Sequence, residues 1–176
     1  MRRIKSVLIL FVVLNFWSFG VCAQGSENTN YRFHEVFFYS FTKYVKWPPS
    51  NSSGDFIIGV LGESDIIPLL RKMAEIKKVG THKIIIKQLT VDDVNQRLNM
   101  LFVPKGKSAL FPNVHQKIGT KPVLLITESE GLARQGSMIN FIDVNGKLRF
   151  EVNTDNMQNA DLKISQELLR FGVAVN

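Results

Sequence analysis

Four short apolar runs constrain the fold of this chain more than any other feature. They lie at residues 56–61, 83–89, 100–103 and 122–127, and each has the length of a buried strand. The segments between them carry amphipathic patterns typical of helices, the clearest of which opens at Ser64 and runs to about residue 78. Because strands separated by helices pair in parallel, the pattern predicts a single α/β domain with a mostly parallel central sheet and flanking helices.

A C-terminal antiparallel hairpin is predicted after these units. Residues 138–144 and 147–153 flank Asn145-Gly146, the strongest two-residue signal for a type I′ turn. This turn places Val144 opposite Lys147, and residues paired across a hairpin share a face. One face is then apolar and consists of Ile139, Phe141, Leu148, Phe150 and Val152. The other face mixes polar residues with one aliphatic residue and consists of Asn140, Ile142, Arg149, Glu151 and Asn153.

The aromatic segment 31–47 predicts a helix that Pro48-Pro49 ends. Four aromatic residues recur at spacings of four, four and three, which is one face of a helix: Phe33, Phe37, Phe41 and Tyr44. An aromatic stripe with this period is more often core than a ligand site, so we expect Phe37 and Phe41 to be core residues. We also expect Thr154 to cap a short turn, and Ser165 to cap a final helix that contains Leu168, Leu169 and Phe171.

Residues 1–23 have the order of a secretory signal peptide. Basic residues precede an apolar run at 7–14, and Val21-Cys22-Ala23 supplies small residues before a cleavage site. The apolar stretch is marginal for a membrane-spanning helix, so an uncleaved anchor is the less favoured alternative, as is a lipid anchor at Cys22. We expect cleavage after Ala23, a flexible leader at 24–30, a domain at 31–176, and no membrane span in the mature chain.

Cleavage changes the charge and the cysteine content. Loss of Arg2, Arg3 and Lys5 reduces the 22 basic residues to 19 against 15 acidic ones, a net charge of +4. No run of five or more basic residues remains, which argues against a nucleic-acid partner. The only cysteine, Cys22, is also lost. The mature chain therefore cannot form a disulfide or a cysteine metal site, and it depends on its apolar core for stability.

The sequence shows no catalytic, metal-binding or cofactor-binding set. The three histidines are far apart and lack the spacing of metal ligands: His34, His82 and His115. Gly59 and Gly62 do not complete a dinucleotide or phosphate-loop fingerprint, and Ser137 is not within G-x-S-x-G. The acidic residues that could form a carboxylate pair are interpreted as surface charges: Glu128, Glu130, Asp143 and Glu151. We predict a protein that is not an enzyme and uses no cofactor.

Two ordered motifs remain to be explained. The first is residues 34–48, which read HEVFFYSFTKYVKWP, and the second is GSMINF at 136–141, followed by RFEVN at 149–153 and LKISQELL at 162–169. In this combination the chain resembles the YfiR-like family of small periplasmic proteins, from about Tyr31 to Gly172. The resemblance implies an α/β periplasmic domain, often a homodimer. Its named member restrains an inner-membrane diguanylate cyclase by binding the cyclase's periplasmic part, which limits cyclic-di-GMP synthesis and biofilm formation. Disulfides support cysteine-containing relatives, whereas this mature chain has no cysteine.

The resemblance predicts a periplasmic regulator that binds and restrains a membrane signalling protein, a diguanylate cyclase or a sensor kinase. The alternative is a periplasmic small-molecule binding protein of a sensor or transport system, using the loops at the carboxyl ends of the strands. A secreted hydrolase ranks last because no motif supports it. For the partner contact we select the mixed face of the hairpin: Asn140, Ile142, Arg149, Glu151 and Asn153. The competing interpretation is that another element covers this face and that Arg149 and Glu151 are structural ion partners.

Overall fold

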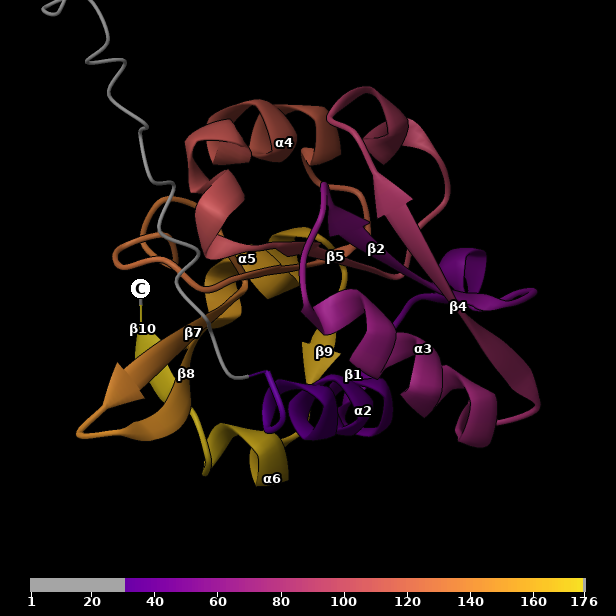
Figure 1. The fold of residues 1–176 in the computed structure, drawn as a ribbon, viewed down its shortest axis with the longest axis horizontal. Helices are drawn as coiled ribbons and strands as arrows, with labels where there is room; N and C mark the ends of the chain where they lie inside the picture. Colours follow the sequence, from indigo (N-terminus) through magenta and orange to yellow (C-terminus); the bar gives the residue numbers. More distant parts are fainter. Residues whose placement is uncertain (1–30, 176) are drawn as a thin grey trace, which may run out of the picture.

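The computed structural model describes residues 31–175, which form a twisted mixed sheet with helices on both faces (Figure 1). The predicted signal peptide and leader lie outside the described residues. The main strands are β2 (Phe56–Leu61), β4 (His82–Leu89), β5 (Met100–Val103), β6 (Leu124–Thr127), β7 (Ile139–Val144) and β8 (Lys147–Asn153). Shorter strands are β1 (Val45–Lys46), β3 (Lys78–Val79), β9 (Lys163–Ile164) and β10 (Val173–Val175). The helices are α2 (His34–Tyr44), α3 (Ile66–Ile76), α4 (Phe111–Ile118), α5 (Thr154–Asn159) and α6 (Gln166–Leu169), with 3-10 turns η2 (Pro49–Asn51), η3 (Asp92–Asn95) and η4 (Lys105–Leu110).

The eight strands of the sheet follow the order β10-β8-β7-β6-β5-β2-β4-β3. Strands β4, β2, β5, β6 and β7 are mutually parallel, and β7 is joined antiparallel to β8. The parallel part therefore has the doubly wound order 2-1-3-4-5, with its change of direction between β2 and β5. The predicted α/β class, the mostly parallel sheet and the C-terminal hairpin are all confirmed. Strands β1 and β9 form a separate two-stranded antiparallel sheet.

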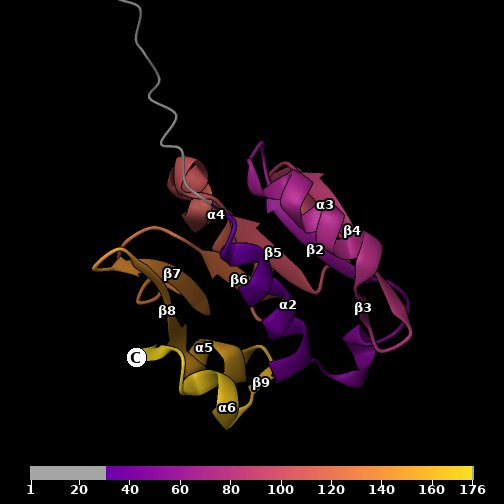
Figure 2. The same ribbon diagram turned by 60° about the horizontal axis from the view of Figure 1, so that its bottom comes forward.

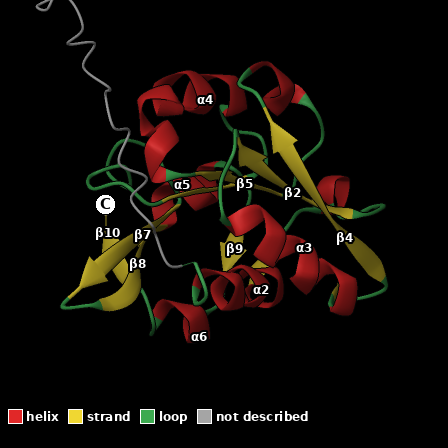
Figure 3. Ribbon diagram, viewed as in Figure 1, coloured by secondary structure: helices red, strands yellow, loops and turns green. Residues whose placement is uncertain are grey.

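Two apolar cores lie on opposite faces of the sheet. The helices that cover these faces are seen in Figures 1 and 2. On one face α2, α3 and α6 pack over the strands, with Phe38, Phe41 and Leu70 fully or almost fully enclosed. On the other face α4 packs through Phe111, Val114 and Ile118. Figure 3 shows the loops that join the ends of the strands to the helices. Pro112 lies in the first turn of α4, where proline fits because an amide at that position has no partner within the helix.

The hairpin has the predicted register. Val144 is opposite Lys147, and the pairing continues to Ile139 opposite Val152. Asn145 and Gly146 have φ values of 55° and 75°, as a type I′ turn requires, and the amide of Gly146 donates to Asp143 Oδ1 at 2.7 Å. The sequence did not predict β10, which pairs in parallel with the outer edge of β8.

The first helix is shorter than predicted and uses a different stripe. Helix α2 begins at His34 and buries His34, Phe38, Phe41 and Thr42. Phe41 is therefore a core residue as predicted, and the partly buried Phe37 packs against the same core. Phe33 is 65% exposed because it lies before the first turn of the helix. The segment carries two overlapping aromatic stripes, and the sheet covers the one centred on Phe38.

Near the C-terminus one predicted cap is confirmed and one is wrong. Ser165 caps α6, with its Oγ accepting from the amide of Leu168 at 3.3 Å. The cap of α5 is Asn153 rather than Thr154, because Asn153 Oδ1 accepts from the amide of Asn156 at 2.9 Å. Helix α6 ends at Leu169, so Phe171 is not a helical residue and is exposed.

Candidate functional site

The mixed face of the hairpin, selected from the sequence, divides into a buried half and an accessible half. Asn140 and Asn153 lie at the base of the hairpin and are buried. Ile142 and Glu151 are partly exposed, and Arg149 is exposed. Ile142 and Arg149 are directly opposite each other across the two strands. The register therefore brings the five residues onto one face, and Ile142, Arg149 and Glu151 are the ones that a partner could reach.

The buried half is a hydrogen-bonded network. Asn140 Nδ2 donates to Glu151 Oε2 at 2.8 Å, and Thr127 Oγ1 donates to Asn140 Oδ1 at 2.7 Å. Ser137 Oγ lies 2.9 Å from Thr127 Oγ1 and donates to the carbonyl of Ile139 at 2.7 Å. These contacts join β6, β7 and β8 and satisfy polar groups that would otherwise be costly to bury. Glu151 is thus held at the boundary between the network and solvent.

Asn153 ties the hairpin to two further segments. Its Oδ1 caps α5, and its Nδ2 donates to the carbonyl of Ala133 at 3.0 Å. The loop 128–137 is therefore fixed to the base of β8. Neither Arg149 nor Glu151 forms an ion pair within residues 31–175. The interpretation of these two residues as structural ion partners gains no support, although a structural role for Asn140 and Asn153 is clear.

A second polar cluster, which the sequence did not reveal, lies at the carboxyl ends of β5 and β6. Glu128 was interpreted as a surface charge, but its side chain is only 5% exposed. Tyr31 Oη donates to Glu128 Oε1 at 2.6 Å, and the backbone amide of Lys105 donates to the same oxygen at 2.8 Å. His34 Nε2 is 3.6 Å from Glu128 Oε2. Residues near the start of α2 and the loops after β5 and β6 thus meet at one buried carboxylate.

His34 in this cluster is buried among aromatic rings. Its ring centroid is 4.9 Å from that of Tyr31 and 4.5 Å from that of Phe141. Burial lowers the pKa of His34 from its ordinary 6.5 to about 4. The 3.6 Å separation from Glu128 is too long for a strong hydrogen bond, so desolvation outweighs the attraction of the carboxylate. His34 is therefore neutral at pH 7.

This burial predicts a loss of stability in mild acid. Because the folded pKa of about 4 lies below the ordinary 6.5, the unfolded chain binds more protons than the folded one between these pH values. The free energy of unfolding should fall by up to about 3 kcal/mol as the pH drops from 6.5 to 4, and His34 should contribute nothing to its pH dependence above that window. Urea denaturation at a series of pH values measures the effect. His34→Phe should flatten this part of the curve, and an unchanged slope in the variant would contradict the assignment.

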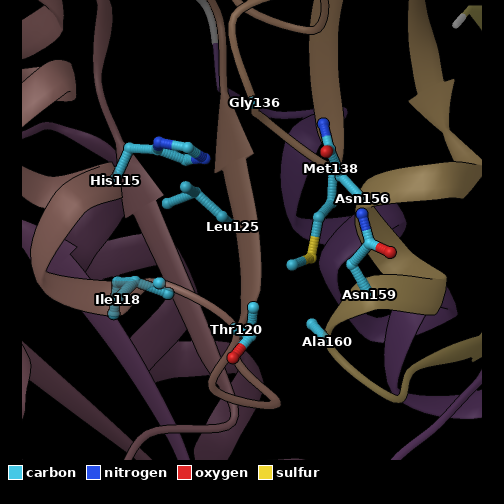
Figure 4. Close-up of a pocket in the computed structure, with 10 residues that line it drawn as sticks. His115, Ile118, Thr120, Leu125, Gly136, Met138, Asn156, Asn159 and Ala160 are labelled. Carbon is cyan, nitrogen blue, oxygen red and sulfur yellow. The ribbon is translucent and has the colours of Figure 1, made fainter.

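A cavity of about 240 Å³ lies at the amino end of the sheet, between α4 and α5 (Figure 4). Its inner wall is apolar and includes Ile118, Leu125 and Met138. Polar side chains lie around it, and none of them has a hydrogen-bond partner within the described chain: His115, Thr120, Asn156 and Asn159. His115 lies against the backbone of Gly136, where a Cβ would meet its ring at 2.3 Å. The cavity is at the opposite end of the sheet from the loops that the sequence favoured for a ligand.

The Trp47-Pro48 motif fastens the end of α2 to the sheet. Trp47 Nε1 donates to the carbonyl of Asn99 at 3.0 Å, and its ring meets that of Phe56 edge-on with centroids 5.0 Å apart. Asn51, in the 3-10 turn that follows, donates through Nδ2 to the carbonyls of Leu98 and Pro122. This motif therefore has a structural role at the start of β2, β5 and β6.

The described residues were searched for membrane-spanning helices and for metal sites. Within residues 31–175 no helix is long and apolar enough to cross a membrane. The same part of the chain contains no group of three or more potential metal-ligating side chains.

Comparison with known proteins extends these findings. None of the curated proteins compared with the chain matches it. A solved structure of an ABC domain in complex with L-Trp from Streptococcus pneumonia superposes with a TM-score of 0.54 at 12% identity, over 78% of this chain and 58% of that one. The chain thus spans somewhat more than half the length of that domain, and the likeness shows a shared fold. A family model described as YfiR/HmsC-like matches residues 31–173, so the resemblance found in the motifs is confirmed and the chain belongs to the YfiR/HmsC-like family.

Proposed function

We propose that this protein is an exported, non-enzymatic periplasmic regulator that binds the periplasmic part of a membrane diguanylate cyclase and restrains it. The observation that carries the proposal is the family match over residues 31–173, nearly the whole described domain. Cyclic-di-GMP control is the activity that this family membership implies. The alternative membrane partner is a sensor kinase.

The hairpin supplies a surface suited to such a contact. Arg149 is exposed, and the partly exposed Ile142 lies opposite it on the same face. Arginine and aliphatic anchors of this kind are common in protein interfaces. Beneath them the Asn140 to Glu151 hydrogen bond and the Asn153 cap of α5 hold the strands in place. The contact residues therefore stand on a rigid support, which reduces the ordering cost of binding.

We predict that Arg149→Glu weakens partner binding by about 1–3 kcal/mol and leaves the fold intact. The side chain is exposed and forms no ion pair in the described chain, so its replacement breaks none there. Tagged mature protein is used to capture partners from detergent-solubilised membranes, with mass spectrometry to identify them. Affinity for the captured periplasmic domain is then measured for both proteins.

Arg71→Glu is the matched control, because Arg71 is an exposed residue of α3 on a different element and undergoes the same charge change. Circular dichroism is recorded for both variants. Full binding by folded Arg149→Glu would remove Arg149 from the interface. Loss of binding together with loss of fold would support a structural role instead.

Small-molecule binding is the second candidate function, and the cavity between α4 and α5 favours it. A space of about 240 Å³ with an apolar wall and four polar side chains that form no hydrogen bond within residues 31–175 suits a small ligand with both apolar and polar groups. Native mass spectrometry of protein purified from its own host tests this candidate. A bound small molecule that dissociates on denaturation would support it, and ligand-free protein would favour the regulator.

A further inference from the structure

The mixed face of the hairpin continues onto β10. Side chains of residues paired in register on neighbouring strands point to the same side of a sheet, and Val173 is paired with Glu151. Gly172 supports this alternation, because a Cβ there would meet Phe150 and Val152, which belong to the apolar core on the α2 side. Val173 therefore points to the side of the sheet opposite α2, where it is 47% exposed.

The same face also extends to the tip of the hairpin. Val144 lies two residues beyond Ile142 on β7, so both side chains point to one side of the sheet. Val144 is 42% exposed, and Lys147, which is paired with it on β8, is exposed too. We call the accessible residues of this three-strand surface the open face, and it consists of Ile142, Val144, Lys147, Arg149, Glu151 and Val173.

Helices cover the neighbouring parts of the sheet. Helix α2 packs on the opposite face of the hairpin, and on the side of the open face α4 shares an apolar core with β5 and β6. The loop 128–137 reaches only the base of the hairpin, where Ala133 accepts from Asn153. Figure 1 shows the hairpin pointing away from α4, and no segment of residues 31–175 encloses Val144 or Val173. The open face is thus a part of the sheet without a covering layer.

The open face carries an excess of positive charge. Neither Lys147 nor Arg149 forms an ion pair within residues 31–175. Glu151 is the carboxylate of the face, and it already accepts a hydrogen bond from Asn140. The face also presents three aliphatic side chains: Ile142, Val144 and Val173. A surface complementary to the open face is therefore apolar and carries acidic residues.

The width of the open face suits an α-helix. Ile142 and Val173 lie on β7 and β10, the strands on either side of β8. Neighbouring strands are about 4.8 Å apart, so these two strands are separated by about 10 Å. A helix with its side chains is about 10–12 Å wide, and helices are the elements that normally cover such a sheet. An amphipathic helix can therefore set its apolar stripe on the aliphatic side chains and acidic residues beside Lys147 and Arg149.

We infer that the open face receives an acidic amphipathic helix from the periplasmic part of the membrane partner. The inference rests on the proposed function for the source of this helix. It adds the form of the contact, and it extends the surface to the tip of the hairpin and to β10. The incoming helix would complete the layer on the α4 side of the sheet.

A second copy of this chain fits the open face less well. Packing two open faces together about a two-fold axis would bring four cations together with two carboxylates. Both carboxylates are those of Glu151, which is already hydrogen-bonded to Asn140. The remaining positive charges would repel each other, so self-association is treated as an outcome of the test.

Photo-crosslinking locates the contact. The photoreactive residue p-benzoylphenylalanine replaces Val173 in one mature protein and Val36 in a control, because Val36 is an exposed aliphatic residue of α2 on the other side of the sheet. Each protein is irradiated with membranes from its own host, and crosslinked peptides are sequenced by mass spectrometry. We expect crosslinks from position 173 alone, to residues three or four apart on one acidic segment of a membrane protein.

Charge and apolar contact are then tested separately on the captured protein. Val173→Asp should weaken its binding by about tenfold or more, whereas the control Val36→Asp should bind within about twofold of the wild type. Circular dichroism is recorded for both variants, and Val144→Asp at the hairpin tip repeats the test without altering β10. Lys147→Glu should also weaken binding, and a lysine in place of the crosslinked acidic residue of the partner should restore it.

The outcomes separate this inference from the proposed function. Full binding of a cyclase or kinase by folded Val173→Asp and Val144→Asp would overturn the inference and leave the proposed function standing. Crosslinks from position 173 to a second copy of this chain, or to residues without helical spacing, would overturn the inference as well. Crosslinks to an acidic helix of a protein without a signalling role would support the open face and overturn the proposed function. Membranes that yield no crosslinked protein from position 173 and no captured partner would overturn both.

Discussion

Replacing Phe41 by alanine should lower the free energy of unfolding by about 3–5 kcal/mol, the range for truncating a buried phenylalanine. Phe41 is fully buried in α2. Its ring lies between the helix and the hairpin, with centroids 5.5 Å from that of Phe150 and 6.0 Å from that of Phe141. The substitution leaves a cavity at the contact between the first helix and the C-terminal hairpin, elements that are distant in sequence. Their rigid neighbours can close such a cavity only in part.

Thermal and urea denaturation measure the loss, which should lower the melting temperature by roughly 10 °C. Phe33→Ala is the matched control, since Phe33 belongs to the same sequence stripe but is 65% exposed. Its effect should stay within about 0.5 kcal/mol. Similar losses of stability in Phe41→Ala and Phe33→Ala would contradict the finding that α2 buries Phe41 and leaves Phe33 exposed. An unchanged melting temperature in Phe41→Ala would indicate that the ring serves binding and does not support the fold.

The elements that sequence reasoning predicted correctly have strong local signals. The apolar runs became β2, β4, β5 and β6 with boundaries within about two residues, because buried parallel strands are continuously apolar. The hairpin register followed from Asn145-Gly146 alone, since a two-residue loop fixes the pairing of every residue beyond it. In these places the local sequence is enough to predict the strand positions and the hairpin register.

The features that sequence reasoning missed depend on distant contacts. Strand β10 has three residues and pairs in parallel with β8, and no local sequence pattern predicts this pairing. Gly172 permits it, because a Cβ there would meet Phe150 at 2.7 Å. The buried face of α2 was predicted wrongly because it includes His34, a polar residue that the apolar pattern does not count. Glu128 looked like a surface charge, and only the fold brings Tyr31 and the Lys105 amide to it.

The arrangement of the five candidate residues was predicted, but their burial was not. All five selected residues do share one face, as the register required. The sequence could not show that Asn140 and Asn153 are buried, because an asparagine is equally suited to solvent and to an internal hydrogen bond. Thr127 and Ala133, which bind them, come from a strand and a loop outside the hairpin. The partner contact therefore stays a prediction for the accessible residues Ile142, Arg149 and Glu151.

Asn99 provides the sharpest test of how buried amides hold this domain. Asn99 is buried just before β5, where its Oδ1 accepts from the amide of Ile57 and its Nδ2 donates to the carbonyl of Asn51, both at 2.8 Å. Asn99→Ala removes the side-chain partner of both backbone groups, of which the Asn51 carbonyl lies in a buried contact and the Ile57 amide in a partly buried one. An unsatisfied buried group costs about 1–3 kcal/mol, so we expect a loss of roughly 4 kcal/mol.

Two variants establish whether hydrogen bonding or packing is responsible. Asn99→Asp keeps an acceptor for the amide of Ile57, and only its uncharged form also carries an O–H donor in place of the amide that donates to Asn51. In acid this variant should therefore retain part of the stability that Asn99→Ala loses at the same pH. Asn95→Ala, at an exposed position of η3, should change the free energy of unfolding by no more than about 0.5 kcal/mol. Urea midpoints with an unchanged m value measure all three variants. If Asn99→Ala were as stable as Asn95→Ala, water would reach the start of β2 and β5. The hydrogen bonds of Asn51, Asn99 and Trp47 would then not be needed to hold that end of the sheet together.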